Sequence, residues 1–218
     1  MRLHYYSHQG AEHILGSTGL LLELDTLLRA LPLPVWRNKS ACNKRLDVVQ
    51  QMLNSLIEDQ MVRRGWLSQA QVIASAHEFY ADFYRLAPRP WSLPGLPDAA
   101  VRALCEVQFG NVARLGLDNE KFRIGRAEGR CDVGVEIVPL RSLAQRIDTS
   151  VATFEKCRQL LERLGCNGLP TPVLVIGLDV DEETEVWDLR AEPFPLIAVK
   201  QSAQCRQRMV QSRRVGAS

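Results

Sequence analysis

Apolar residues recur at helical spacing along the first sixty residues of the chain. Ser17 and Thr18 precede a leucine-rich stretch and favour a capped helix over about 18–30, which Pro32 and Pro34 end. A second helix is predicted over about 43–63. Its buried stripe would be Leu46, Val49, Met52, Leu53, Leu56, Ile57 and Met61.

The spacing then changes to that of strands. An aromatic-rich segment at 78–85 and the alternating segment 101–109 predict two strands, with a proline-rich loop at 87–98 between them. After a polar, glycine-containing stretch at 115–130 follow a strand at 133–139, a helix at 153–164 and an apolar, interior strand at 171–178. This order predicts an α/β fold, a mixed central sheet flanked by helices.

The 218 residues suffice for a single domain with a sizeable core. We divide it into N-terminal helices (1–70), an α/β core (75–190) and a basic C-terminal tail (195–218) that either follows a nucleic-acid backbone or is disordered. No apolar run reaches the ~20 residues of a membrane span, and the N-terminus lacks the layout of a signal peptide. We therefore expect no membrane partner and a cytoplasmic protein.

The net charge of +2 does not by itself indicate a nucleic-acid-binding protein. Basic residues gather locally, however, as at Arg123, Arg126 and Arg130 and again in the tail. Such patches can contact phosphates, although each also fits a solvated surface. The six cysteines form no C-x-x-C pair, which argues against a zinc site or a disulfide framework.

The strand at 101–109 carries two polar side chains on one face. Alternation places Glu106 and Gln108 together, with Cys105, Val107 and Phe109 on the opposite face. A carboxylate and a carboxamide at this spacing can converge on a hard cation such as Mg²⁺, with the Val107 carbonyl as a further ligand. The pattern alone favours the plainer interpretation, a solvent-facing Glu and Gln on a half-exposed strand.

The segment Glu106-Val107-Gln108-Phe109-Gly110-Asn111 resembles the signature strand of the BglII-like restriction endonucleases, the E-x-Q branch of the PD-(D/E)xK nuclease class. The similarity extends over residues ~1–190, and it is weaker outside the hexapeptide. The resemblance implies a Mg²⁺-dependent type II restriction endonuclease that cuts a short palindromic DNA site as a homodimer and leaves 5′-phosphate ends.

The family also implies a metal-binding Asp on the strand before Glu106. Asp82 lies within the predicted strand, and Asp98 lies in the proline-rich loop, closer in sequence. A strand pre-organises a carboxylate better than a loop does. Asp82 is thus the preferred ligand and catalytic residue beside Glu106 and Gln108, with Asp98 as the alternative. In this scheme Gln108 orients the attacking water.

The resemblance further implies the DNA contacts. Asn111 corresponds to a base-reading Asn, and a carboxamide can pair bidentately with adenine. Relatives carry a second recognition loop near 148–150, where Thr149 and Ser150 could instead cap the following helix. Candidate phosphate contacts are Arg114, Arg123 and Arg126. Two alternatives stay open: a repair or mobile-element nuclease without palindrome specificity, and a non-catalytic DNA-binding module.

Overall fold

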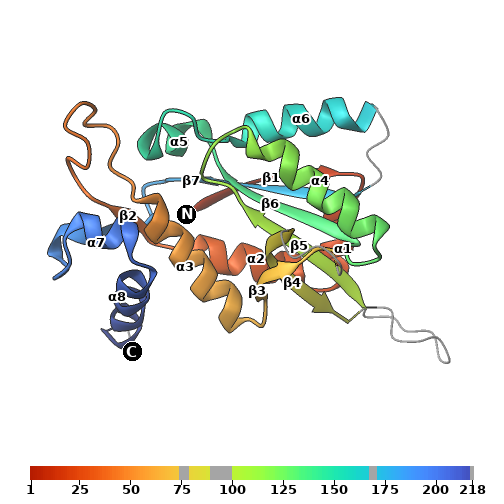
Figure 1. Cartoon of the computed structure of the whole chain (residues 1–218), viewed down its shortest axis with the longest axis horizontal. Helices are drawn as coiled ribbons and strands as arrows, with labels where there is room; N and C mark the ends of the chain where they lie inside the picture. The colour runs from red at the N-terminus through yellow and green to blue at the C-terminus, as the bar shows by residue number, and fades with distance from the viewer. Residues whose placement is uncertain (74–78, 89–99, 167–170, 217–218) are drawn as a thin grey trace.

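A six-stranded mixed sheet runs through the computed structural model, which describes residues 1–73, 79–88, 100–166 and 171–216 (Figure 1). The strand order is β1-β7-β6-β5-β4-β3. Neighbouring strands are antiparallel except for β5–β6 and β6–β7, which are parallel. The strands are β1 (Arg2–His8), β3 (Leu67–Gln71), β4 (Tyr80–Ala87), β5 (Val101–Val107), β6 (Val133–Pro139) and β7 (Val173–Asp179). The predicted mixed sheet is therefore confirmed.

Helices cover both faces of this sheet (Figure 1). One face packs against α1 (Ala11–Ser17), α2 (Leu20–Arg29) and α3 (Gln50–Arg63). The other packs against α4 (Arg114–Ala127) and α6 (Phe154–Cys166). Alternation along β7 shows the division, because Leu174 and Ile176 belong to the first core and Val173 and Val175 to the second. The short helix α5 (Arg141–Ile147) follows β6.

The N-terminal helices differ from the sequence pattern in two features: the N-cap of α2 is Gly19, which offers no side-chain hydrogen bond, and α3 begins later than predicted. Helix α2 matches the predicted 18–30 segment, but α3 begins at Gln50 and not near 43. Val48 forms a β-bridge with Val35, and the Asp47 carboxylate pairs with both Nε and Nη2 of Arg146, at 2.9 and 2.8 Å. These tertiary contacts hold the preceding segment extended, and the apolar Leu46 lies outside the helix.

The sequence pattern did not predict several elements, among them the strands β1 and β3 and the helix α4. β1 and β3 lie at the edges of the sheet, where a strand buries few side chains and shows weak alternation. The polar stretch 115–130 is largely helix α4, which buries Leu115 and Phe122 but also Asp118 and Asn119. Its inward face is partly polar, so the apolar spacing of an amphipathic helix is interrupted.

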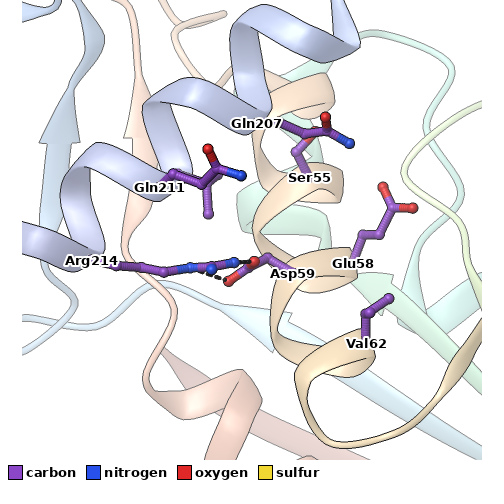
Figure 2. A pocket seen from close by; sticks show the side chains of 8 residues that line it. Ser55, Glu58, Asp59, Val62, Gln207, Gln211 and Arg214 are labelled. Carbon is purple, nitrogen blue, oxygen red and sulfur yellow. Dashed lines mark hydrogen bonds and ion pairs between the residues drawn. The ribbon is translucent and has the colours of Figure 1, made fainter.

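The basic tail forms two helices, α7 (Leu196–Gln201) and α8 (Ala203–Gly216). Met209 and Val210 are buried in the main core, and α8 packs along α3. Figure 2 shows the groove between these helices, where Arg214 of α8 points to Asp59 of α3 and its Nε lies 3.1 Å from Oδ2. The described part of the tail is thus an ordered helical layer.

A second, two-stranded sheet pairs β2 (Leu33–Val35) in parallel with β8 (Val186–Asp188), which a 3₁₀ turn at Leu189–Ala191 follows. It connects the N-terminal helices to the segment after β7. None of the helices in the described part of the chain combines the length and the apolar composition that crossing a bilayer requires.

Candidate active site

Asp82 of β4 and Glu106 of β5 meet across an antiparallel strand pair. The register pairs Phe83 with Cys105, so one further step places Asp82 opposite Glu106. The Asp82 carboxylate accepts a hydrogen bond from the backbone N–H of Val107 at 2.8 Å. The preferred sequence candidate therefore lies beside Glu106, whereas Asp98 lies outside the described residues.

These carboxyls line a cavity of about 640 Å³ at the carboxyl end of β5. The walls come from β4, β5, α4 and the first turns of α3. The polar residues of the lining are Gln50, Asn54, Tyr80, Asp82, Glu106, Gln108, Asn111, Arg114, Asp118 and Lys121. A smaller cavity shares Asn54, Asp82 and Val107 with the first and is also lined by Glu58 of α3.

Glu106 faces α4, as the predicted alternation requires, and it is only 3 % exposed. Cys105 and Phe109 lie in the core on the opposite face. Burial, followed by the charge of Asp82, raises the pKa of Glu106 to about 8. Burial likewise raises the pKa of Asp82. Two neighbouring carboxyls that resist ionisation in this way favour a cation between them.

Glu136, itself buried, adds a third carboxyl on the same face. It pairs in register with Glu106 on the neighbouring parallel strand and is 1 % exposed. Neither of its carboxylate oxygens has a hydrogen-bond partner among the described residues. Burial, reinforced by the charges of Asp118 and Glu106, raises the pKa of Glu136 well above its usual range.

Gln108 connects β5 to α4. Its Nε2 donates to Asp118 Oδ2 at 3.1 Å, and its Oε1 accepts from the backbone N–H of Gly110 at 2.9 Å. Lys121, one turn further along α4, places its Nζ 2.9 Å from Glu106 Oε1 and 3.4 Å from Asp118 Oδ1. A continuous polar network therefore fixes the side chains around the cavity.

The oxygen ligands available here fit a hard divalent cation. No group of three or more His, Cys, Asp or Glu side chains within the described ranges forms a complete metal cage. Mg²⁺ rarely requires one, because it keeps several waters and takes one or two carboxylates together with substrate phosphates. Asp82 and Glu106 supply two carboxylates, and Val107 lies between them in the same cavity wall.

Two loops lie side by side at the mouth of the site. Asn111 forms an isolated β-bridge with Val151. The N–H of Ala152 donates to the Gly110 carbonyl at 2.9 Å, and that of Val112 donates to the Ser150 carbonyl at 3.1 Å. Asn111, Thr149 and Ser150 are exposed on this joined surface. The capping alternative for 149–150 is wrong, because Thr153 Oγ1 accepts from Lys156 N at the start of α6.

The three candidate arginines all lie on α4 but differ in position. Arg114 lines the cavity. Arg123 is paired with Glu120, its Nε 2.8 Å from Oε2, and Arg126 donates to the Asp132 carbonyl at 3.2 Å. Neither lies in the cavity wall, so the structure brings only Arg114 together with the carboxyls.

Sequence reasoning missed Asp118, Lys121 and Glu136 as parts of the site. For Glu136 a signal existed, since a single acid stands within the apolar strand Val133–Pro139. For Asp118 and Lys121 the signal required recognising α4 as a helix. Arg114, Leu117, Asp118 and Lys121 then follow the i, i+3, i+4, i+7 spacing of one helical face.

Comparisons with known proteins identify the family and the fold. The family model described as restriction endonuclease BglII/BglIII matches residues 3–178. Restriction endonuclease BglII complexed with a DNA 16-mer is a structural neighbour at a TM-score of 0.63 and 22 % identity, covering 84 % of this chain and 79 % of that one. Free BglII gives a TM-score of 0.54 at 20 % identity, covering 84 % and 82 %. Among curated proteins none matches the chain.

The family match, on a chain with this fold, identifies a metal-dependent nuclease. The chain belongs to the BglII/BglIII restriction endonuclease family, whose model covers most of its length. It is a sequence-specific type II restriction endonuclease, a hydrolase that cuts DNA.

Proposed function

We propose that this enzyme, acting as one endonuclease domain, hydrolyses both strands of a short palindromic double-stranded DNA site with Mg²⁺ and leaves 5′-phosphate ends. The observation that carries the proposal is the meeting of Asp82 and Glu106 across β4 and β5, beside the cavity that Gln108, Asn111 and Arg114 also line. BglII, the structural neighbour, is described in complex with DNA. We place the enzyme in the cytoplasm, where incoming DNA is met.

Asp82, Glu106 and the carbonyl of Val107 would hold the cation. When bound, Mg²⁺ supplies Lewis acidity and lowers the pKa of water. The chain's own residues position the reacting groups. Gln108 is fixed by Asp118 and Gly110, yet its amide keeps a second N–H and its carbonyl a second lone pair. It can therefore orient the attacking water without carrying charge.

Base reading and phosphate contact would involve separate residues. Asn111, Thr149 and Ser150 would read base edges from the two joined loops. Arg114 contacts the phosphates nearest the cut, and Arg123 and Arg126 contact the backbone further along α4. A homodimer would match a palindrome, because each subunit then cuts one strand.

The direct test is digestion of a sequenced plasmid by the purified protein with Mg²⁺. We expect discrete fragments whose ends share one palindrome and carry 5′-phosphates, shown by ligation and end sequencing. Glu106→Ala should bind the same DNA but not cut it, and full cutting by this variant would contradict the assignment. A smear without sequence preference would favour the nonspecific nuclease, and no cutting at all would favour the non-catalytic DNA-binding module.

A further inference from the structure

The cavity contains an ammonium group that no motif in the sequence indicates. Lys121 reaches from α4 toward β5, and its Nζ lies 2.9 Å from Glu106 Oε1 and 3.4 Å from Asp118 Oδ1. Only 14 % of its side chain is exposed. Of the residues that line the cavity in the described part of the chain, Lys121 and Arg114 are the cations, and Lys121 is the one that contacts Glu106.

The position of this lysine is fixed from several sides. Asp118 is buried at 2 % exposure and binds both Gln108 and Lys121, so the ammonium is anchored to β5 and to its own helix. One residue further on, Phe122 is fully buried against β6, where it lies over Gly134. A lysine side chain ordinarily samples many rotamers, and fixing it costs conformational entropy. The contacts of Lys121 offset this cost and hold its ammonium at one place in the cavity.

The charges and hydrogen-bond donors at Lys121 leave room for one more anion. An ammonium has three N–H donors, of which one donates to Glu106 Oε1, while Asp118 adds an ion pair at 3.4 Å. Hydrolysis of a phosphodiester increases negative charge on the phosphate oxygens, which a fixed cation stabilises. Gln108 is neutral, and of the two cations that line the cavity in the described part of the chain, Lys121 is the one that contacts Glu106.

We propose that Lys121 is a catalytic residue of this enzyme, the cation that contacts the scissile phosphate and supplies from α4 the positive charge that β5 lacks. The inference rests on the proposed function, because it needs a phosphodiester in the cavity. Glu106 and Asp118 hold the ammonium between them in the free protein, and an N–H that Glu106 does not use binds a non-bridging oxygen of the DNA.

The test compares Lys121→Met, which keeps the length of the side chain and removes its charge, with Lys121→Arg, which keeps the charge. We expect single-turnover cleavage by Lys121→Met to fall about 100-fold or more, and Lys121→Arg to retain more activity than Lys121→Met. The double variant Gln108→Lys/Lys121→Met returns an ammonium to the cavity from β5. It should recover at least about a tenth of the wild-type rate.

A second readout separates this role from a purely structural one. Calorimetric titration of the metal-free proteins with Mn²⁺ alone, above the Glu106 pKa of about 8, measures how freely the carboxylates bind a cation. Lys121→Met should bind Mn²⁺ at least as tightly as the wild type, because the ammonium that shares Glu106 is gone. Weaker Mn²⁺ binding by a folded Lys121→Met would show that the lysine only arranges the carboxyls, and would overturn the proposal.

Wild-type cleavage by Lys121→Met would also overturn it, as would a double variant no faster than Lys121→Met. If Lys121→Met loses its thermal unfolding transition, Lys121→Gln replaces it in every comparison, since an amide can still donate to Asp118. Failure of this inference can be distinguished from failure of the proposed function. If the proposed function is wrong, the wild-type protein itself leaves DNA uncut with Mg²⁺, whereas if only this inference is wrong, the wild type still cuts.

Discussion

The backbone N–H of Val107 donates a hydrogen bond to the Asp82 carboxylate at 2.8 Å, which joins the two strands that carry Asp82 and Glu106. This contact fixes one oxygen of Asp82 and turns the carboxylate toward the cavity that Glu106 lines. A charge-assisted bond of this kind is stronger than a neutral one, so the spacing of the two carboxyls is set before any substrate arrives.

Asp82→Asn should therefore lose cleavage while it keeps the fold. The carboxamide oxygen can still accept from Val107, but the charge that a cation needs is absent. We expect a loss of about 100-fold or more in single-turnover rate with Mg²⁺ and an unchanged unfolding temperature. Asp98→Asn is the matched control and should cut normally. Inactive Asp98→Asn beside active Asp82→Asn would reverse the assignment of the acid.

Asn111→Ala should reduce discrimination between the target site and other DNA. Its Oδ1 accepts from the Ala113 N–H at 3.0 Å, which orients the carboxamide at the mouth of the site. Loss of one bidentate base contact costs ~1–3 kcal/mol, or about 10- to 100-fold in the ratio of specific to nonspecific affinity. Fluorescence anisotropy on both DNAs at fixed salt measures this ratio.

Asn111→Asp provides the control for that measurement. The carboxylate keeps the acceptor for Ala113 but loses the N–H donors that adenine needs, so discrimination should fall as it does in Asn111→Ala. An equal loss of affinity on both DNAs, in either variant, would mean that Asn111 contacts only the backbone.

Glu136→Gln should flatten the dependence of stability on pH. Burial, with the charges of Asp118 and Glu106, raises the pKa of Glu136 in the folded protein, so folding retains a proton that the unfolded chain gives up above about pH 4.3. Stability thus decreases as pH rises past that value, and the amide removes this contribution. We expect the variant to melt higher at pH 8, with each 1 kcal/mol worth ~2–4 °C.

Thermal unfolding between pH 5 and pH 8, roughly the range in which proteins are most stable, measures the effect. Glu120→Gln is the control, because this carboxyl is exposed and its ion pair with Arg123 contributes little in water. Curves for Glu136→Gln and wild type that run parallel over the whole range would show that Glu136 is ionised in the folded protein.

Gly134→Ala should displace α4 from the sheet. A Cβ at this position would lie 2.6 Å from Cδ2 and 2.7 Å from Cγ of Phe122, which is buried in the second core. Overpacking of this kind costs ~1–3 kcal/mol. Cleavage should fall as well, because the neighbouring Lys121 and Asp118 move with the helix.

Gly116→Ala on the same helix is the matched substitution. No atom lies within 4 Å of the added Cβ, and alanine favours a helix over glycine by ~1 kcal/mol. It should leave stability unchanged or raise it. Denaturant unfolding measures the free energy of unfolding of both variants. If Gly134→Ala is as stable as the wild type, close packing against Phe122 is not the reason why a glycine stands at this position.

The interior of this fold was predictable because burial produces regular patterns. β6 was predicted at 133–139 and β7 near 171–178, and α6 near 153–164, since their side chains meet apolar layers on one or both sides. The edge strand β1 was not predicted, because it buries few side chains. The start of α3 depends on the Asp47–Arg146 contact, which joins residues far apart in sequence.

The candidate site was predictable on its strands and not on its helix. Glu106 and Gln108 stand out as polar residues within an otherwise buried segment, and Asp82 lies in a clear strand. Lys121 and Asp118 lie on α4, whose inward face is polar because it covers the cavity. Because the polar residues of the site interrupt its apolar spacing, this helix was not predicted from the sequence pattern.

The two loops joined at Asn111 and Val151 have a consequence for how such an enzyme changes its target. Backbone hydrogen bonds from Ala152 to Gly110 and from Val112 to Ser150 join the two loops. A substitution that moves the backbone of one loop should therefore also move the backbone of the other. New target sequences would then arise through paired substitutions in both loops, with single changes passing through poorly discriminating intermediates. A library built to retarget the enzyme should randomise the two segments together.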